Sequence, residues 1–194
     1  MAQPPKTVPE LLEALEDRSF TTYKCRIRAY ERIQGRSRAW NAALISLATA
    51  TTVAAIGLLV DDSMYGASGE TLLAACSVLA LAASLVVASL DYPGRAVRVE
   101  VNYKEIQDIA SRIQAARSVN SQPTLANYYD LHGSYSDLVR HSENHTSGDR
   151  DAYEGNISWS RFFTFALTFL PYATFVLPMW LFWQFGAWVI HGSG

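Results

Sequence analysis

The chain has 194 residues, of which 49% are hydrophobic, and it carries a formal net charge of −2. This length is enough for one domain, or for one membrane domain with a small soluble layer. The average composition is ordinary for a soluble protein, but it hides a chain in which apolar blocks alternate with charged segments. The first twenty residues are polar and acidic and lack the apolar run of a secretory signal peptide, so we expect internal segments to direct membrane insertion.

Residues 1–19 are expected to form an N-terminal tail and a short helix. Thr7 is the expected N-cap of that helix, Pro9 lies in its first turn, and Glu10 closes a capping box. Residues 20–142 are expected to form the main domain. It begins with a helix that has one apolar face and one basic face, and the apolar residues are Phe20, Tyr23, Ile27 and Tyr30.

Two apolar blocks, Ala42–Val60 and Leu72–Leu90, organise the chain. Each block has about nineteen residues, or ~28 Å of helix, which is close to the ~30 Å hydrocarbon core of a bilayer. Neither block has a polar face, and no Lys or Arg occurs between Ala39 and Gly94. We therefore predict a transmembrane hairpin with helices at about 41–60 and 71–90.

Small side chains recur every four residues in both blocks and form two ridges. Such ridges let helix backbones approach closely in lipid, either within the hairpin or between subunits. The ridge residues, which we predict to serve helix packing or oligomerisation, are Ala42, Ser46, Ala50 and Ala54, and Cys76, Ala80, Ser84 and Ala88. Thr49 and Thr52 are candidates for lining a pore, although hydroxyl bonding to the carbonyl four residues back is the simpler explanation.

Amphipathic helices are expected after the hairpin. One follows Tyr92-Pro93-Gly94, and the Phe20–Tyr30 face is its natural partner. Thr124 is the expected cap of another helix, and residues 143–158 are expected to form a polar loop. The apolar face of the first helix holds Val99, Tyr103, Ile106, Ala110 and Ile113, and that of the second holds Tyr128, Leu131, Tyr135 and Leu138.

Residues 159–194 form a third segment, which is rich in aromatic residues and contains Pro171 and Pro178. From Phe162 to Ile190 it has about 29 residues, or ~43 Å of straight helix, which exceeds the bilayer core. A single kinked membrane helix is the first expectation, and a re-entrant or interfacial arrangement is the second. We expect this segment to pack against the hairpin at its periphery and to leave the small-residue ridges free for self-association.

Charges around the hairpin predict its orientation. By the positive-inside rule, the N-terminus and the Arg95–Ser158 region are cytoplasmic, and Asp61–Glu70 faces outward. The predicted fold class is thus an all-α membrane protein with a transmembrane hairpin, an aromatic third membrane helix and a cytoplasmic layer of amphipathic helices. The residues expected to set the topology and meet lipid headgroups are Arg28, Arg32, Arg36, Arg38, Trp40, Arg95 and Arg98.

No constellation in the sequence carries catalysis. Phosphate-binding glycine motifs and the Gly-x-Ser-x-Gly motif do not occur. His132, His141 and His145 lack the paired spacing of a metal site. No charged residue lies inside a predicted span, which argues against a proton relay. We therefore predict no enzyme activity, no cofactor and no metal. We also predict no nucleic-acid partner, because the basic Lys24–Arg38 cluster adjoins a membrane helix.

The arrangement around the hairpin resembles a known family. A basic helix with tyrosines (YKCRIRAYERIQGRSRAW) leads into two membrane helices joined by a short turn, and a second such helix (RAVRVEVNYKEIQDIASRI) follows. This is similar to the SLATT proteins, the SMODS and SLOG-associating two-transmembrane effectors. The resemblance covers roughly Phe20 to Leu138, and its specific points are Tyr23, Arg26, Trp40, Asn41, Arg95, Ala96 and Tyr103.

The resemblance implies an oligomeric effector in the bacterial inner (plasma) membrane that serves an antiphage defence system with nucleotide signalling. On activation it would form a pore or permeabilise the membrane and so cause abortive infection. The implied partners are the lipid bilayer, further copies of the chain, and a nucleotide-signalling enzyme or sensor protein. The alternative is a non-conducting anchor or scaffold that recruits a soluble enzyme. The aromatic third segment departs from the family's two-helix pattern.

Overall fold

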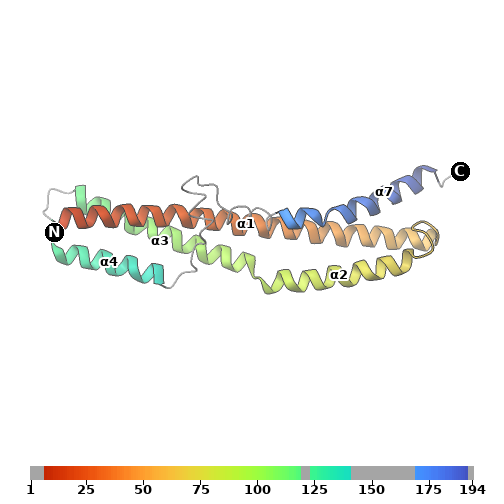
Figure 1. The fold of residues 1–194 in the computed structure, drawn as a ribbon, viewed down its shortest axis with the longest axis horizontal. Coiled ribbons are helices and arrows are strands. Elements are labelled where there is room, and N and C mark those ends of the chain that lie inside the picture. Colours follow the sequence, from red (N-terminus) through yellow and green to blue (C-terminus); the bar gives the residue numbers. More distant parts are fainter. Residues whose placement is uncertain (1–6, 119–122, 141–168, 192–194) are drawn as a thin grey trace, which may run out of the picture. The chain divides into compact units, whose positions relative to one another are not determined.

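The computed structural model describes residues 7–118, 123–140 and 169–191 (Figure 1). Its helices are α1 (Val8–Val60), α2 (Gly69–Ser89), α3 (Tyr92–Ser118), α4 (Leu125–Arg140) and α7 (Val176–His191). No strand occurs in these ranges, so the prediction of an all-α protein is confirmed. The tail at 1–6, the polar loop at 143–158 and the first part of the aromatic segment lie outside the described residues.

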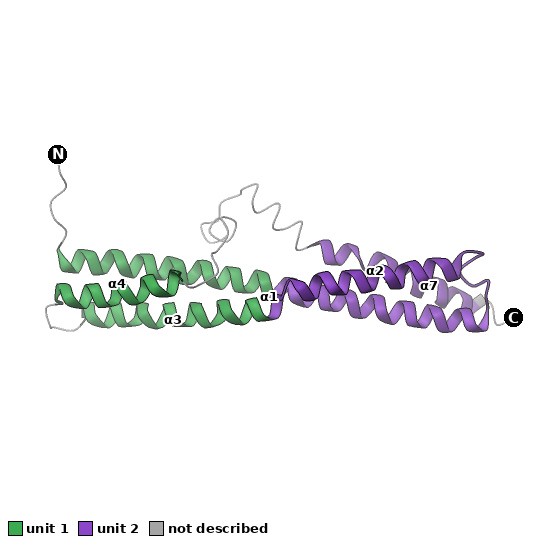
Figure 2. Ribbon diagram, turned by 90° about the horizontal axis from the view of Figure 1, so that it is seen from below, with its two compact units in different colours: residues 1–33, 94–162 green, residues 34–93, 163–194 purple. Residues whose placement is uncertain are grey.

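The chain divides into two compact units, which Figure 2 shows in separate colours. Unit 1 contains residues 1–33 and 94–162, and unit 2 contains residues 34–93 and 163–194. Among the described helices, unit 1 therefore holds the first part of α1 together with α3 and α4. Unit 2 holds the rest of α1 together with α2 and α7.

Helix α1 is continuous from its N-cap to the hairpin turn. The backbone N–H of Thr7 donates to Glu10 Oε2 at 2.8 Å, which is the reciprocal half of the expected capping box. Within α1 no proline follows Pro9, and Gly35 and Gly57 are its only glycines. The short helix, the basic helix and the first span predicted from the sequence are therefore one element.

The core of unit 1 differs from the predicted apolar face of α1. Phe20 is 49% exposed, whereas the buried side of α1 advances in steps of three and four residues, as in a coiled coil. Tyr23 and Tyr30 nevertheless contact Tyr103, with ring centroids 6.2 and 5.8 Å apart, so the expected pairing with α3 is confirmed. The buried α1 positions are Leu12, Leu15, Ser19, Cys25, Arg26, Ala29 and Ile33.

Helix α4 packs on this core through the face that the sequence predicted. Leu131 and Tyr135 are buried, and Tyr128 and Leu138 pack beside them. Thr124 caps α4, because its N–H donates to Asn127 Oδ1 at 3.1 Å and its Oγ1 accepts from the Asn127 N–H at 3.3 Å.

Polar contacts also hold α4 in place. The hydroxyls of Thr22 and Tyr135 lie 2.8 Å apart, and Asn102 Nδ2 donates to the Leu138 carbonyl at 3.1 Å. Arg26 is only 1% exposed, so unit 1 has an interior that is partly polar. The apolar α3 residues that pack in the same cluster are Ile106, Ile109 and Ile113.

Unit 2 packs three membrane-type helices around small side chains. Its core cluster contains Ala50, Ala54 and Leu58 from α1, Leu73 from α2 and Leu181 from α7. At 1.5 Å per residue, α2 is ~31 Å long, which matches the bilayer core. The expected hairpin is thus present, with its turn between Val60 and Gly69.

Two glycines of unit 2 make a matched test of this packing. A Cβ on Gly69 would lie 2.9 Å from the Cβ of Tyr65, whereas no described atom lies within 4 Å of a Cβ on Gly35. We expect Gly69→Ala to lower the free energy of unfolding by about 1–2 kcal/mol through overpacking. Gly35→Ala should leave it unchanged or raise it by up to about 1 kcal/mol, because alanine is the better helix former.

Reversible unfolding of the purified protein in mixed detergent micelles measures both variants. Equal effects of the two substitutions would contradict the close approach at Gly69.

Candidate functional site

The outward surface of unit 2 is made of large apolar side chains. On α2, Val78 and Leu79 are 67% and 66% exposed, and on α7, Trp183 and Ile190 are 75% and 74% exposed. A water-soluble protein rarely exposes so large an apolar surface. Three helical stretches, Val8–Val60, Gly69–Ser118 and Phe169–Ile190, are long and apolar enough to cross a membrane by length and composition. This surface is therefore typical of a protein that lies in a membrane.

The structure divides the eight predicted ridge residues among three environments. Ala50, Ala54 and Cys76 are buried inside unit 2, and both cysteines of the chain are free thiols. Ser46, Ala80 and Ser84 are half-buried, and Ala42 and Ala88 are exposed. Leu181 of α7 packs on Ala50 and Ala54, so the expectation that the third segment leaves these ridges free is wrong for this part of α1.

The two candidate pore-lining threonines lie on the outward side of α1. Thr49 and Thr52 are exposed, and their hydroxyls donate to the carbonyls of Ile45 and Ala48, each at 2.8 Å. This is the backbone bonding that the simpler explanation requires. Each hydroxyl oxygen keeps acceptor capacity toward the outside of the helix. Ala48 and Ala55 are exposed on the same side.

The basic residues near the membrane helices are mainly at the surface. Arg28, Arg38 and Arg98 are exposed, and Arg32, Arg36, Arg95 and Trp40 are half-buried. Arg28 Nη1 lies 2.9 Å from Glu31 Oε2, an exposed pair that contributes little to stability. The burial of Arg26 was not expected from the sequence, because a charged side chain usually lies on the surface of a helix.

The turn between α1 and α2 is ordered by Asp61. Its Oδ1 accepts from the N–H and the hydroxyl of Ser63 at 2.8 and 2.7 Å, and its Oδ2 accepts from the Trp188 indole at 2.8 Å. Gly66 has φ +77°, a left-handed conformation that glycine adopts without steric cost. The hydrogen bonds from Ser63, with that from Trp188, hold the pKa of Asp61 below its usual value of 3.8.

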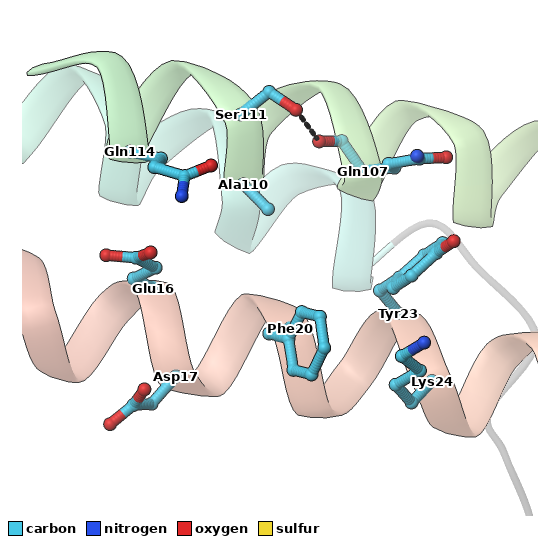
Figure 3. A pocket seen from close by; sticks show the side chains of 9 residues that line it. All are labelled: Glu16, Asp17, Phe20, Tyr23, Lys24, Gln107, Ala110, Ser111 and Gln114. Carbon is cyan, nitrogen blue, oxygen red and sulfur yellow. Dashed lines mark hydrogen bonds between the residues drawn. The ribbon is translucent and has the colours of Figure 1, made fainter.

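A groove of about 520 Å³ lies between α1 and α3 in unit 1, and Figure 3 shows its lining. We call it the α1–α3 groove. Lys24 Nζ lies 5.2 and 5.4 Å from the ring centroids of Phe20 and Tyr23, so its ammonium group sits over two aromatic faces. The other lining residues are Glu16, Asp17, Gln107, Ala110, Ser111 and Gln114.

The groove did not emerge from the sequence, because its residues come from two distant helices. The lining contains one lysine and two carboxylates, and Glu16 also pairs with Arg117. The balance of charges is therefore unfavourable for an anionic ligand. His132 packs against Tyr128 with ring centroids 5.5 Å apart, whereas His141 and His145 lie outside the described residues.

The fold and the surface together define an all-α membrane protein with a charged helical unit of its own. The chain matches the SMODS and SLOG-associating 2TM effector domain, family 5 (SLATT_5), over residues 8–190, and it belongs to this family. The resemblance noted in the sequence is thereby confirmed. The matched residues 8–190 extend beyond the stretch from Phe20 to Leu138 that carried the resemblance. The family is one of effector domains associated with SMODS and SLOG proteins. No curated relative and no solved structure matches the chain.

The depressed pKa of Asp61 predicts a stability difference that depends on pH. A carboxylate whose pKa is lowered on folding stabilises the folded state above its unfolded pKa, and this contribution is lost as pH falls through the folded pKa. Wild type should therefore be more stable than Asp61→Asn at neutral pH, and the difference should shrink only below about pH 3.8.

Thermal unfolding in detergent between pH 7 and pH 3 measures this difference. Asp62→Asn is the matched control, because the Asp62 side chain is exposed on the same turn. A stability difference between wild type and Asp61→Asn that does not change with pH would contradict the assignment.

Proposed function

We propose that this chain is an oligomeric effector in the bacterial inner membrane that forms a pore on activation within an antiphage, nucleotide-signalling defence system. Its family of SMODS- and SLOG-associating effectors supports the setting. The observation that carries the pore is the packing of unit 2. Among the described residues its interior is filled by Ala50, Ala54, Leu58, Leu73 and Leu181, which supports conduction by several copies rather than by one.

The outward side of α1 is the proposed wall of that pore. It presents Ala48, Thr49, Thr52 and Ala55, which are small or carry a hydroxyl, among the exposed aliphatic residues Ile45, Ile56 and Leu59. The outward side of α2 presents large aliphatic residues such as Val78, Leu81 and Leu85, and small ones such as Ala82. Small side chains permit close helix approach in lipid, and hydroxyl oxygens offer water a hydrogen-bonding partner.

The orientation belongs to the same proposal. The N-terminus and unit 1 face the cytoplasm, because Arg28, Arg32, Arg36 and Arg38 precede the first span and Arg95 and Arg98 follow the second. The turn with Asp61 and Asp62 faces outward. Unit 1 would then be the part that a nucleotide-signalling enzyme or a sensor reaches, while the arginines meet anionic headgroups.

A scaffold without conduction is the second candidate, and the α1–α3 groove favours it. This groove places the half-exposed Phe20 beside polar groups of both signs, a surface on which a protein partner could bind. A scaffold would tolerate bulky substitutions on the outward side of α1 and respond to substitutions in the groove. A pore would show the opposite pattern.

Two alanine-to-leucine substitutions separate these functions. Ala50→Leu is unsuitable, because Ala50 is 1% exposed and the change would overpack unit 2 itself. Ala48 and Ala82 are both exposed, on α1 and α2 respectively. We expect Ala48→Leu to reduce membrane depolarisation on induced expression about tenfold or more, as loss of one close helix contact of about 1.4 kcal/mol per copy would.

Ala82→Leu should leave depolarisation unchanged, since α2 already exposes leucines there. The measurement is a potential-sensitive dye in cells, with equal amounts of each variant in the membrane fraction. An unchanged potential in cells that express activated wild type would refute the pore and leave the scaffold.

A further inference from the structure

Helix α7 is joined to the α1–α2 turn at its far end. Trp188 Nε1 donates to Asp61 Oδ2 at 2.8 Å, and we call this hydrogen bond the latch. The Tyr65 hydroxyl donates to the Leu181 carbonyl at 3.4 Å. A Cβ on Gly57 would lie 3.3 Å from the Phe185 ring. The last turns of α7 therefore lie against the end of α1.

Helix α7 also covers the small-residue surface of α1. Leu181 is 1% exposed and packs on Ala50, Ala54, Leu58 and Leu73. The two alanines let this leucine approach the α1 backbone, and they would let a helix of another copy approach in the same way. While α7 is in place, that surface of α1 is occupied from within the same chain.

Helix α7 is held there by one side, and its other side is exposed. Trp183 and Ile190 are exposed, whereas Pro178 and Leu181 are buried, and Leu177 packs beside the same cluster. Lipid tails are as apolar as the exposed side chains and supply no comparable drive toward tighter burial. The position of α7 therefore depends on the packing of Leu177, Pro178 and Leu181 and on directional contacts, which include the latch.

We propose that α7 is a removable cover, and that opening the latch exposes the Ala50–Ala54 surface to a membrane helix of a second copy. This regulatory step rests on the proposed pore function, because assembly of several copies is what the cover would restrain. The latch fits this role because it lies at the end of α7 and joins α7 to the turn rather than to the helices of the hairpin.

The first test uses two aromatic substitutions on α7. Trp188→Phe keeps a ring and removes the N–H donor, and Trp183→Phe makes the same change at a 75% exposed position. The loss of one hydrogen bond at the membrane surface shifts an equilibrium by about twofold to tenfold. We expect Trp188→Phe to raise dye efflux from liposomes without any activating signal by that factor, and Trp183→Phe to equal wild type.

Efflux from Trp188→Phe at or below the wild-type rate would overturn the proposal. A lower rate would mean that docked α7 is part of the conducting structure. Circular dichroism and the yield of protein in the membrane establish that each variant is folded.

The second test closes the latch covalently. The double variant Asp61→Cys/Trp188→Cys lacks the latch and can be bridged by a short, reducible thiol cross-linker, and each single variant controls for reaction at Cys25 or Cys76, which are both buried. We expect the bridged protein to stay monomeric and silent. Reduction of the bridge should produce larger assemblies by native mass spectrometry and restore efflux.

The two readouts separate the two proposals. Efflux and assembly that are the same before and after reduction would overturn the cover and leave the pore standing. Assembly on reduction without any efflux would support the cover and refute the pore.

Discussion

Close contact between helices at alanine residues is the constraint on which unit 2 depends. In a bilayer the hydrophobic effect does not drive one apolar helix onto another, so the contact must come from packing. Ala50 and Ala54 provide it, because their short side chains admit Leu181 of α7 and lie in the same cluster as Leu73 of α2. One surface of α1 thus serves two intramolecular neighbours. Any oligomer must use another surface or displace one of these neighbours.

Unit 1 is built on the opposite principle. Its helices gain stability from apolar burial, of about 1.5–3 kcal/mol for each fully buried aliphatic side chain, and Ile106 and Ile113 are completely buried. Yet Ser19, Arg26 and Asn102 are buried in the same unit. Buried polar groups are costly unless they are hydrogen-bonded, and in helical bundles they can select one register over others. The hydrogen bonds of Asn102 and Tyr135 between helices fix the position of α4, which apolar contacts alone would define less well.

The elements were predictable from the sequence where one physical signal dominated. Uncharged blocks of bilayer length predicted α2 and the second part of α1. The cap at Thr7 was correctly located because Glu10, three residues on, completes it, and Thr124 was also correctly expected to cap a helix. The apolar face of α4 was also correct, since its pattern has no polar interruption. The predicted buried face of α1 in unit 1 was wrong at Phe20, which is exposed. Ser19 and Arg26 are buried instead, and a prediction that counts only apolar residues does not include them.

The candidate sites show why spacing alone is insufficient in a membrane helix. Ala42, Ser46, Ala50 and Ala54 share one ridge in the sequence, but a straight ridge of four-residue steps drifts around a helix of 3.6 residues per turn. Its first member is exposed and its last is buried. The contact between Asp61 and Trp188 joins residues 127 positions apart, and nothing local to either residue announces it. From the sequence, Asp61 is explained by its place in a turn, where an aspartate bonds to nearby backbone groups. Trp188 is explained by its place near a membrane surface, where tryptophan is common. Only the folded chain shows that one carboxylate accepts hydrogen bonds from both Ser63 and Trp188, and that the turn and α7 are joined in this way.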